Sequence, residues 1–358
     1  MITVLHYLRH LDLGGTAKTC QLFFEQLTSP DFNTIVAYEK GGDHPRLEEF
    51  QKAAAVCGGT LVAVDSYQDG DPTGDDLQAV IDMYEVDIVH TYRSGYAEFP
   101  EPGVHIHVPH FVETNVFGFI DQNPKVSKSL FMSRWLMDHT LRGRLHPRFD
   151  FVNNPVEMPY SDKRISGLSS DAIWLGRCGR PDNGIYNSVS VDAARLLRMQ
   201  GHDVRFLVVA PPSNMINDLA EYEIPFKVIE PTTNPLVLSQ FYNSVDIYAH
   251  ARADGETFGV NIAEAMIHGK PVVTHIATPS NPNMGVFQSQ TELVDDGETG
   301  FIVNNDPAEY AEALLRLINN EKLREDFGHA AIFKSVKEYH VDACVAKLEK
   351  IYREIADE

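Results

Sequence analysis

The stretch that decides the fold runs from Asp246 to Thr274 and reads DIYAHARADGETFGVNIAEAMIHGKPVVT. It predicts a short buried strand, a loop with two glycines, a helix over about 259–268, and a second buried strand that follows Gly269. A helix that begins directly after a glycine-bearing loop presents unpaired backbone N–H groups, which bind phosphate readily. The stretch therefore predicts an anion site at the end of a strand in an α/β fold.

Two glutamates of this stretch, Glu256 and Glu264, are separated by seven residues. Read alone, Glu256 would balance the positive end of the helix dipole, and Glu264 would lie on a solvated helix face. Beside a predicted phosphate site, Glu256 can reach over the N-terminal mouth of the helix, and Glu264 can accept hydrogen bonds from sugar hydroxyls.

The whole stretch resembles the signature of glycosyltransferase family 4. The resemblance rests on the glutamate spacing, on Phe258–Gly259, and on the later run Ala-Met-x-x-Gly-x-Pro-Val-Val. It implies a retaining, nucleotide-sugar-dependent enzyme of the GT-B fold, in which two Rossmann-like α/β domains face each other across a cleft and the C-terminal helix crosses back. In that family Glu256 would position the sugar, Glu264 the ribose, and the backbone of Phe258, Gly259 and Val260 the donor phosphates.

The composition suits a globular protein with two cores. The chain has 358 residues, of which 43% are hydrophobic and 23% charged. No apolar run is long enough to span a membrane, and the N-terminus lacks the features of a signal peptide. The four cysteines are widely spaced, which argues against a disulfide framework and is compatible with a reducing cytoplasm. A net charge of −21 argues against nucleic acid as a partner.

Strand-like and helix-like segments alternate along the chain, which favours α/β layers. The resemblance implies an N-terminal acceptor-binding domain, a linker and a C-terminal donor-binding domain. The expected bounds are 1–158 for the first domain, 159–167 for the linker, 168–339 for the second domain, and about 340–358 for the crossing helix.

Two features of the N-terminal half are candidates for the site. Gly14 and Gly15 lie between the first predicted strand and helix, a weak phosphate-loop signal because the third glycine of the dinucleotide fingerprint is missing. In family 4 such a loop lies near the donor diphosphate and the acceptor. Residues 104–112 predict a strand, and the resemblance implies that His110, at its carboxyl end, lies over the donor sugar as a catalytic residue. His90 is a second candidate.

Metal binding has two weaker signals in the same half. His105 and His107 alternate along the predicted strand, but His110 is out of that alternation, so a histidine metal site is not favoured. Asp69 and Asp71 form an Asp-x-Asp, which in other glycosyltransferases holds a metal-bound diphosphate. Here they lie in a turn-rich acidic loop, which favours a solvated role. We therefore expect no metal and no cofactor beyond the nucleotide-sugar substrate.

The second domain opens on a strand that ends in Gly-Arg, at Arg177. The resemblance implies that this arginine and a lysine about six positions later grip the donor diphosphate. Asn183 stands at that lysine position, so the sequence departs from the family pattern there. Arg180 is the candidate to replace the missing cation.

Charge reverses locally in residues 125–148, which hold six Lys/Arg against one Asp. This segment is a surface helix or a contact with an anionic membrane or a phosphorylated acceptor. The sequence as a whole predicts a metal-independent retaining glycosyltransferase in the cytoplasm, with a nucleotide sugar and a glycan, lipid or small-molecule acceptor as partners. The alternatives are a GT-B epimerase or phosphorylase, and a catalytically silent nucleotide-sugar-binding protein.

Overall fold

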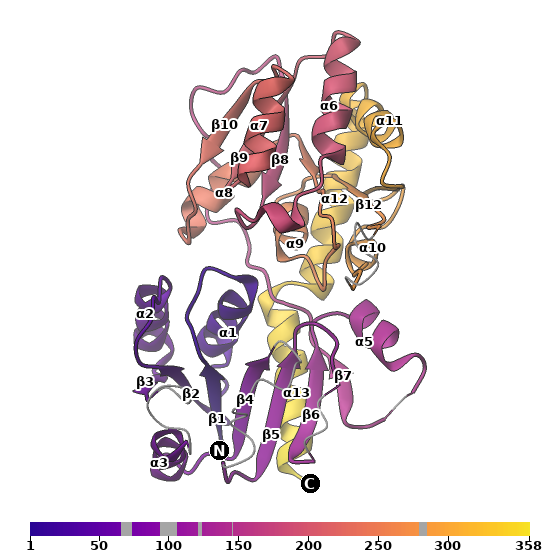
Figure 1. The fold of residues 1–358 in the computed structure, drawn as a ribbon. Helices are drawn as coiled ribbons and strands as arrows, with labels where there is room; N and C mark the ends of the chain where they lie inside the picture. Colours follow the sequence, from indigo (N-terminus) through magenta and orange to yellow (C-terminus); the bar gives the residue numbers. More distant parts are fainter. Residues whose placement is uncertain (66–73, 94–105, 121–123, 145, 279–284) are drawn as a thin grey trace. The chain divides into compact units, whose positions relative to one another are not determined.

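The computed structural model describes residues 1–65, 74–93, 106–120, 124–144, 146–278 and 285–358. They form two compact units, each built on its own parallel sheet (Figure 1). Unit 1 comprises Met1–Pro155 and Val341–Glu358, and unit 2 comprises Val156–His340, which includes the predicted linker. Asp69, Asp71 and His105 lie outside the described residues.

Unit 1 has a seven-stranded sheet in the order β3-β2-β1-β4-β5-β6-β7. Its strands are β1 (Ile2–Leu8), β2 (Phe32–Glu39), β3 (Thr60–Val64), β4 (Ile88–Arg93), β5 (His110–Asn115), β6 (Val126–Phe131) and β7 (Phe149–Phe151). Its helices are α1 (Gly15–Gln26), α2 (Leu47–Cys57), α3 (Asp75–Met83), α5 (Arg134–Leu141) and α13 (Val341–Ala356).

The C-terminal helix α13 belongs to unit 1, as the predicted crossing helix requires (Figure 1). Its apolar stripe includes Leu348, Ile351 and Ile355, which pack with α1 and with the sheet residues Val4 and Ile88 in one buried cluster. Apolar residues three and four positions apart lie on one face of a helix, and burying that face fixes the helix on the sheet.

Unit 2 has a six-stranded sheet in the order β10-β9-β8-β11-β12-β13. Its strands are β8 (Ile173–Cys178), β9 (Val204–Val209), β10 (Phe226–Ile229), β11 (Ile247–Ala249), β12 (Val272–His275) and β13 (Gly300–Val303). Its helices are η1 (Asn183–Ile185), α6 (Val189–Met199), α7 (Ser213–Glu221), α8 (Pro235–Ser244), α9 (Val260–Ile267), α10 (Gln290–Leu293), α11 (Pro307–Ile318) and α12 (Glu321–Glu338).

In unit 2 the strands β9 and β10 are added on one side of β8, and the later strands β11, β12 and β13 on its other side. Both neighbours of β8 run parallel to it, so the helices that follow β8 and β11 leave the sheet on opposite sides of this point. Such a switch point opens a crevice at the carboxyl ends of the two strands, where doubly wound α/β proteins bind ligands. The fold alone therefore places the candidate site beyond Cys178 and Ala249.

The predicted strand over 104–112 is wrong at its start, although its last residues, 110–112, lie in a strand. Strand β5 begins at His110, and residues 106–109 are not in a strand. Pro109 has no N–H to donate to a sheet, so the ladder begins only after it. The backbone of His107 is bonded instead by the side chain of Gln78, over 2.7 and 3.0 Å.

The described helices include none with the length and apolar character that crossing a bilayer requires.

Candidate active site

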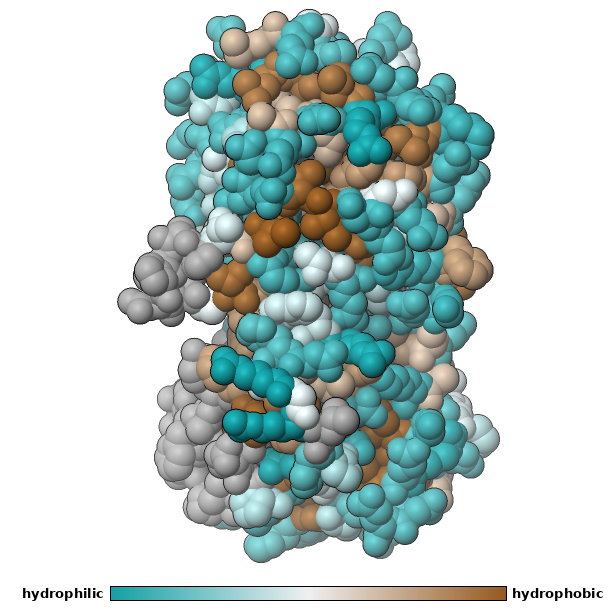
Figure 2. Space-filling view, turned by 90° about the vertical axis from the view of Figure 1, so that its right-hand side faces the viewer, coloured by the Kyte–Doolittle hydropathy of each residue, from teal (hydrophilic) through white to brown (hydrophobic). Residues whose placement is uncertain are grey.

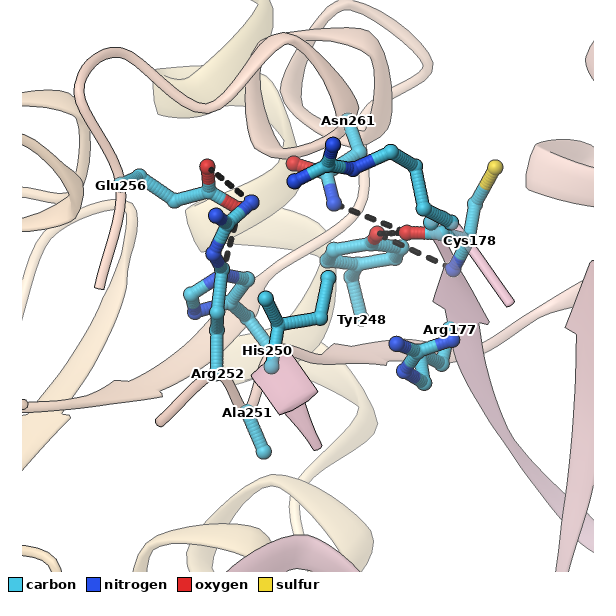
Figure 3. A pocket seen from close by; sticks show the side chains of 11 residues that line it. Arg177, Cys178, Tyr248, His250, Ala251, Arg252, Glu256 and Asn261 are labelled. Carbon is cyan, nitrogen blue, oxygen red and sulfur yellow. Dashed lines mark hydrogen bonds and ion pairs between the residues drawn. The ribbon is translucent and has the colours of Figure 1, made fainter. Parts of the chain in front are cut away.

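A pocket that is partly open to solvent lies at the switch point of unit 2 (Figure 3). It is formed by the ends of β8 and β11, the loop after β11 and the first turn of α9. Its lining residues are Arg177, Cys178, Gly179, Arg180, Ile185, Tyr248, His250, Ala251, Arg252, Glu256 and Asn261. Arginines from two different strand ends therefore surround a single carboxylate.

The loop before α9 depends on two glycines. Gly255 has a φ of +70°, and a Cβ there would lie 1.7 Å from the carbonyl oxygen of Phe287. Gly259 has a φ of +104° and precedes the first residue of α9. The predicted helix over about 259–268 is confirmed, with Gly259 and His268 as its two caps. Only glycine adopts such a backbone without strain, so these residues aim the helix N-terminus at the pocket.

The carboxylate of Glu256 has a partner on each oxygen (Figure 3). Its Oε1 lies 3.2 Å from Nε2 of His250, and its Oε2 accepts a hydrogen bond of 3.3 Å from Arg252. Burial favours the neutral form, but the charge of Arg252 and the hydrogen bond with His250 prevail and lower the pKa of Glu256. Glu256 is therefore a buried anion held in one orientation.

The positive charge of Arg252 is balanced by two carboxylates. Its guanidinium donates to both oxygens of Asp254, over 2.6 and 3.0 Å, and also to Glu256. Burial acts to lower the pKa of Arg252, but the charge of Glu256 and the hydrogen bond to Asp254 together raise it above its ordinary value. Arg252 thus holds the loop together and keeps its charge.

Arg177, the last residue but one of β8, is 6% exposed. Its Nη1 is buried and has no hydrogen-bond partner among the described residues. Burial lowers the pKa of Arg177 below its usual value, although a guanidinium stays charged in proteins. An unpaired buried donor is costly, so its place in a pocket wall indicates that an anionic ligand completes it.

Arg180 is exposed and lines the same pocket. Its charge helps to lower the pKa of Glu256, which places it within electrostatic reach of that carboxylate. Asn183 does not line the pocket. Its side chain bonds the hydroxyl of Ser213 at 2.9 Å and the backbone N–H of Asn214 at 3.0 Å, and so holds the start of α7. Asn183 therefore has a structural task in this chain.

The remaining predicted residues of unit 2 divide between core and site. Phe258 is 1% exposed, and its ring packs edge-on against Tyr339, so it belongs to the core and does not line the pocket. Val260 begins α9. Glu264 lies on α9 outside the pocket lining, and its Oε2 accepts a hydrogen bond of 2.8 Å from Tyr242. Its carboxylate is thus oriented by a buried tyrosine.

The candidates of unit 1 lie at opposite edges of its sheet. Gly14 and Gly15 follow the carboxyl end of β1 and begin α1. His110 is the first residue of β5 and pairs with Ile88, the first residue of β4, so it lies at the amino edge. The expectation that His110 ends its strand is therefore wrong, and it cannot share an edge with the glycines. His90 is buried inside β4, where it bonds Tyr352 at 2.5 Å.

Sequence analysis missed three residues that hold Glu256: His250, Arg252 and Gln290. His250 directly follows a buried strand, and its position at the switch point is a signal that could have found it. Arg252 lies in an irregular loop, and a loop has no periodic sequence pattern from which side-chain contacts can be predicted. Gln290 accepts the backbone N–H of Glu256 at 3.0 Å from 34 residues away, and no local pattern indicates such a contact.

Metal ligands do not gather in the described part of the chain, where no three His, Cys, Asp or Glu side chains are grouped to hold an ion. The Asp-x-Asp of residues 69–71 lies outside that part.

Part of unit 2 is similar to a known protein family. Residues 170–320 match the family model of glycosyl transferases group 1. The phosphatidyl-myo-inositol mannosyltransferase of Mycobacterium leprae is 27% identical over 53% of this chain and 48% of its own length. The capsular polysaccharide biosynthesis glycosyltransferase CapM of Staphylococcus aureus is 27% identical over 57% and 51%. The chain thus spans about half the length of these curated relatives.

Solved structures match over nearly the whole chain. A glycosyltransferase from Rickettsia africae superposes with a TM-score of 0.75 and 17% identity, covering 99% of this chain and 98% of its own. Anabaena Alr3699/HepE, solved in complex with UDP-glucose, gives a TM-score of 0.73 and 15% identity over 99% and 100%. At such identities the likeness establishes the fold. The chain therefore has the GT-B fold of these glycosyltransferases, and residues 170–320 of its second unit are similar to the glycosyl transferases group 1 family.

Proposed function

We propose that this protein transfers a sugar from a nucleotide-diphosphate sugar to a hydroxyl acceptor, with retention of the anomeric configuration and without a divalent metal. The observation that carries the proposal is the buried Nη1 of Arg177, which lacks a partner in the described part of the chain and lies in the wall of a pocket at the switch point. A diphosphate offers the charge and the acceptor oxygens that this donor lacks.

The diphosphate would lie between two arginines and a helix. Arg177 comes from β8 and Arg180 from the loop after it, while the first turn of α9 contributes Asn261 to the wall of the same pocket. Negative charge builds up on the leaving phosphate as the glycosidic bond breaks. Fixed donors and a helix N-terminus stabilise that charge more in the transition state than in the ground state. These groups would do the electrostatic task that a metal performs elsewhere.

Glu256 would bind sugar hydroxyls as an anion. Its lowered pKa keeps it ionised, and Arg252 and His250 fix its orientation. In retaining transfer, the acceptor oxygen bonds the anomeric carbon on the face that the phosphate leaves, and the departing phosphate takes the acceptor proton. A protein base is not required for this step. Glu264, oriented by Tyr242, would accept the ribose hydroxyls.

The identity of the donor is a choice between UDP- and GDP-sugars. Anabaena Alr3699/HepE binds UDP-glucose, and the Mycobacterium leprae relative is named as a mannosyltransferase. Both support a nucleotide hexose as donor. We give His110 no role in the reaction because it begins β5 at the amino edge of the sheet.

A thermal-shift panel with UDP, GDP, ADP and their glucose or mannose conjugates tests donor binding. We expect one nucleotide to raise the melting temperature, because binding at a hundred times the Kd stabilises by about 2.7 kcal/mol. Hydrolysis of the matching sugar nucleotide then separates an enzyme from a silent binding protein. No shift with any of these compounds would overturn the proposal.

We also propose that unit 1 contacts an anionic membrane, at the inner surface, through part of the basic segment 125–148. Lys125 and Lys128 donate to backbone carbonyls, whereas Arg142 and Arg144 are exposed after α5. Gly118 packs against α5, and the apolar side chains around it are 36–40% exposed: Phe117, Phe119 and Ile120. Figure 2 looks onto the side that carries α5 and shows strongly hydrophilic and apolar side chains next to each other on this unit.

Sedimentation with liposomes tests this contact. Each basic residue near an anionic surface contributes about 1 kcal/mol, so reversing both charges in Arg142→Glu/Arg144→Glu should weaken binding at least tenfold. The matched control, Lys52→Glu/Lys350→Glu, changes the charge of unit 1 equally on other helices. Equal binding of wild type to neutral and anionic liposomes would leave 125–148 as an ordinary surface segment.

A further inference from the structure

The segment Phe287–Gln290, just before and at the start of α10, is bonded to the loop that carries Glu256. The N–H of Phe287 donates to the carbonyl of Asp254 at 2.9 Å, and the N–H of Ser289 donates to the carbonyl of Glu256 at 3.0 Å. The hydroxyl of Ser289 donates to the carbonyl of Thr257 at 2.9 Å. Glycine at 255 lets the carbonyl of Phe287 approach so closely.

Gln290 completes this connection and is 0% exposed. Its Oε1 accepts the backbone N–H of Glu256 at 3.0 Å. Its Nε2 donates to the carbonyl of His275, at the carboxyl end of β12, at 3.2 Å. One buried amide therefore links the backbone of Glu256 to the rigid end of a central strand.

The side chain of Glu256 is tied to the same strand end. Nε2 of His250 contacts the carboxylate, and Nδ1 of His250 lies 2.8 Å from the hydroxyl of Thr274 in β12. Gln288 adds two hydrogen bonds just after this strand end. Its side-chain amide donates to the carbonyl of Ala277 at 2.7 Å and accepts from the N–H of Ala277 at 3.0 Å. Backbone and carboxylate of Glu256 are thus fixed independently to one element.

We propose that Gln290 is a positioning residue that holds Glu256 in register for the donor sugar. This inference rests on the proposed function and deepens it. A nucleotide that lacks the sugar has no group for Glu256 to bind. Gln290 therefore affects the binding and transfer of the sugar but not the binding of the nucleotide. Transfer requires the sugar to be held in a defined orientation at its anomeric carbon. Displacing the carboxylate by about 1 Å weakens its hydrogen bonds to the sugar hydroxyls and so disturbs that orientation.

The test uses Gln290→Met, which keeps the length of the side chain and removes its three hydrogen bonds, to Glu256, to His275 and, at 2.8 Å, to Oε1 of Gln288. The matched control is Thr291→Val, which removes a hydroxyl bond to the carbonyl of Gln288 on the same helix. We expect Gln290→Met to lower kcat for hydrolysis of UDP-glucose or GDP-mannose about tenfold, with the Kd of UDP or GDP unchanged. A merely structural role would weaken nucleotide binding as well, and unchanged kcat would overturn the proposal.

Hydrogen exchange provides a readout that needs no ligand. Amides of residues 254–258 should exchange about tenfold faster in Gln290→Met than in wild type or Thr291→Val. Equal exchange in all three would overturn the positioning role. If wild type binds no nucleotide, the proposed function fails while the exchange result still stands. Should Gln290→Met not fold, Ser289→Ala removes one bond to the same loop, and the same two measurements apply.

Discussion

At the scale of single residues, Glu256 is a buried anion whose partners come from the loop around it and from the end of β12. Glu256→Gln removes the charge and leaves Arg252 with less neutralisation, so the pocket becomes more positive. We expect UDP or GDP to bind as tightly as to wild type or more tightly. Turnover of the donor should fall ten- to a hundredfold, because a charge-assisted hydrogen bond contributes about 1.5–3 kcal/mol.

Calorimetry and a donor-hydrolysis assay measure both quantities. Glu298→Gln, an exposed carboxylate of the same unit, is the control and should change neither. Weaker nucleotide binding in Glu256→Gln would contradict the view that Glu256 faces the sugar and the arginines face the phosphates.

His6 makes the stability of unit 1 depend on pH. The ring is fully buried, with Nδ1 at 3.0 Å from the hydroxyl of Tyr92 and Nε2 without a partner among the described residues. Burial lowers the pKa of His6 to about 3. Below about pH 6.5, His6 binds a proton in the unfolded chain but stays neutral in the folded unit. The free energy of unfolding therefore falls as the pH falls from about 6.5 towards 3.

The slope for one such histidine is about 1.4 kcal/mol per pH unit. Between pH 6.5 and 5 we expect His6 to remove about 2 kcal/mol of stability. Thermal unfolding should show that His6→Gln loses less melting temperature over this interval than wild type, whatever its stability at pH 7. His10→Gln, an exposed ring, should behave as wild type. Parallel curves for wild type and His6→Gln would contradict the prediction.

At the scale of elements, the loop between β11 and α9 packs closely against the backbone of Phe287, and Gly255 makes this close approach possible. Gly255→Ala forces a Cβ to within 1.7 Å of the carbonyl of Phe287, in addition to the strain of a φ of +70°. Gly201→Ala, with a φ of +94° and nothing within 4 Å of the added Cβ, carries the strain alone. Backbone strain of this kind costs about 1–3 kcal/mol.

We therefore expect Gly255→Ala to lower the melting temperature more than Gly201→Ala and to lower donor turnover, which Gly201→Ala should leave unchanged. Circular dichroism and the hydrolysis assay check this. Equal effects of the two variants would show that the contact between the loop and Phe287 does not hold the site.

The elements differ in how far the sequence predicts them. The helix after Gly259 is predicted because glycine, apolar spacing and a stop at Gly269 all agree, and α9 confirms it. The start of β5 is not predicted, because the alternation over 104–112 suggests a longer strand, whereas Pro109 has no N–H to donate and the ladder begins after it. Arg177 and Glu256 are found from motif spacing. Gln290 is not, because a contact across 34 residues depends on tertiary packing that no local pattern carries.

At the scale of the whole molecule, the proposed chemistry draws its positive charge from the protein. Arg177 and Arg180 line the pocket, together with Arg252, whose charge Asp254 and Glu256 balance, and Asn261 of α9. We expect turnover of the donor to survive EDTA with less than a twofold loss. Nearly complete loss, restored by Mn²⁺ or Mg²⁺, would contradict metal independence and direct attention to Asp69 and Asp71.

Titration of the matching nucleoside diphosphate, UDP or GDP, into wild type, Arg177→Met and Arg180→Met tests the central claim most directly. The claim is that unit 2 binds the donor diphosphate through a buried arginine whose Nη1 has no hydrogen-bond partner among the described residues. We predict that Arg177→Met raises the Kd at least tenfold, with a smaller rise in Arg180→Met because that side chain is exposed. An unchanged Kd in Arg177→Met would contradict the account.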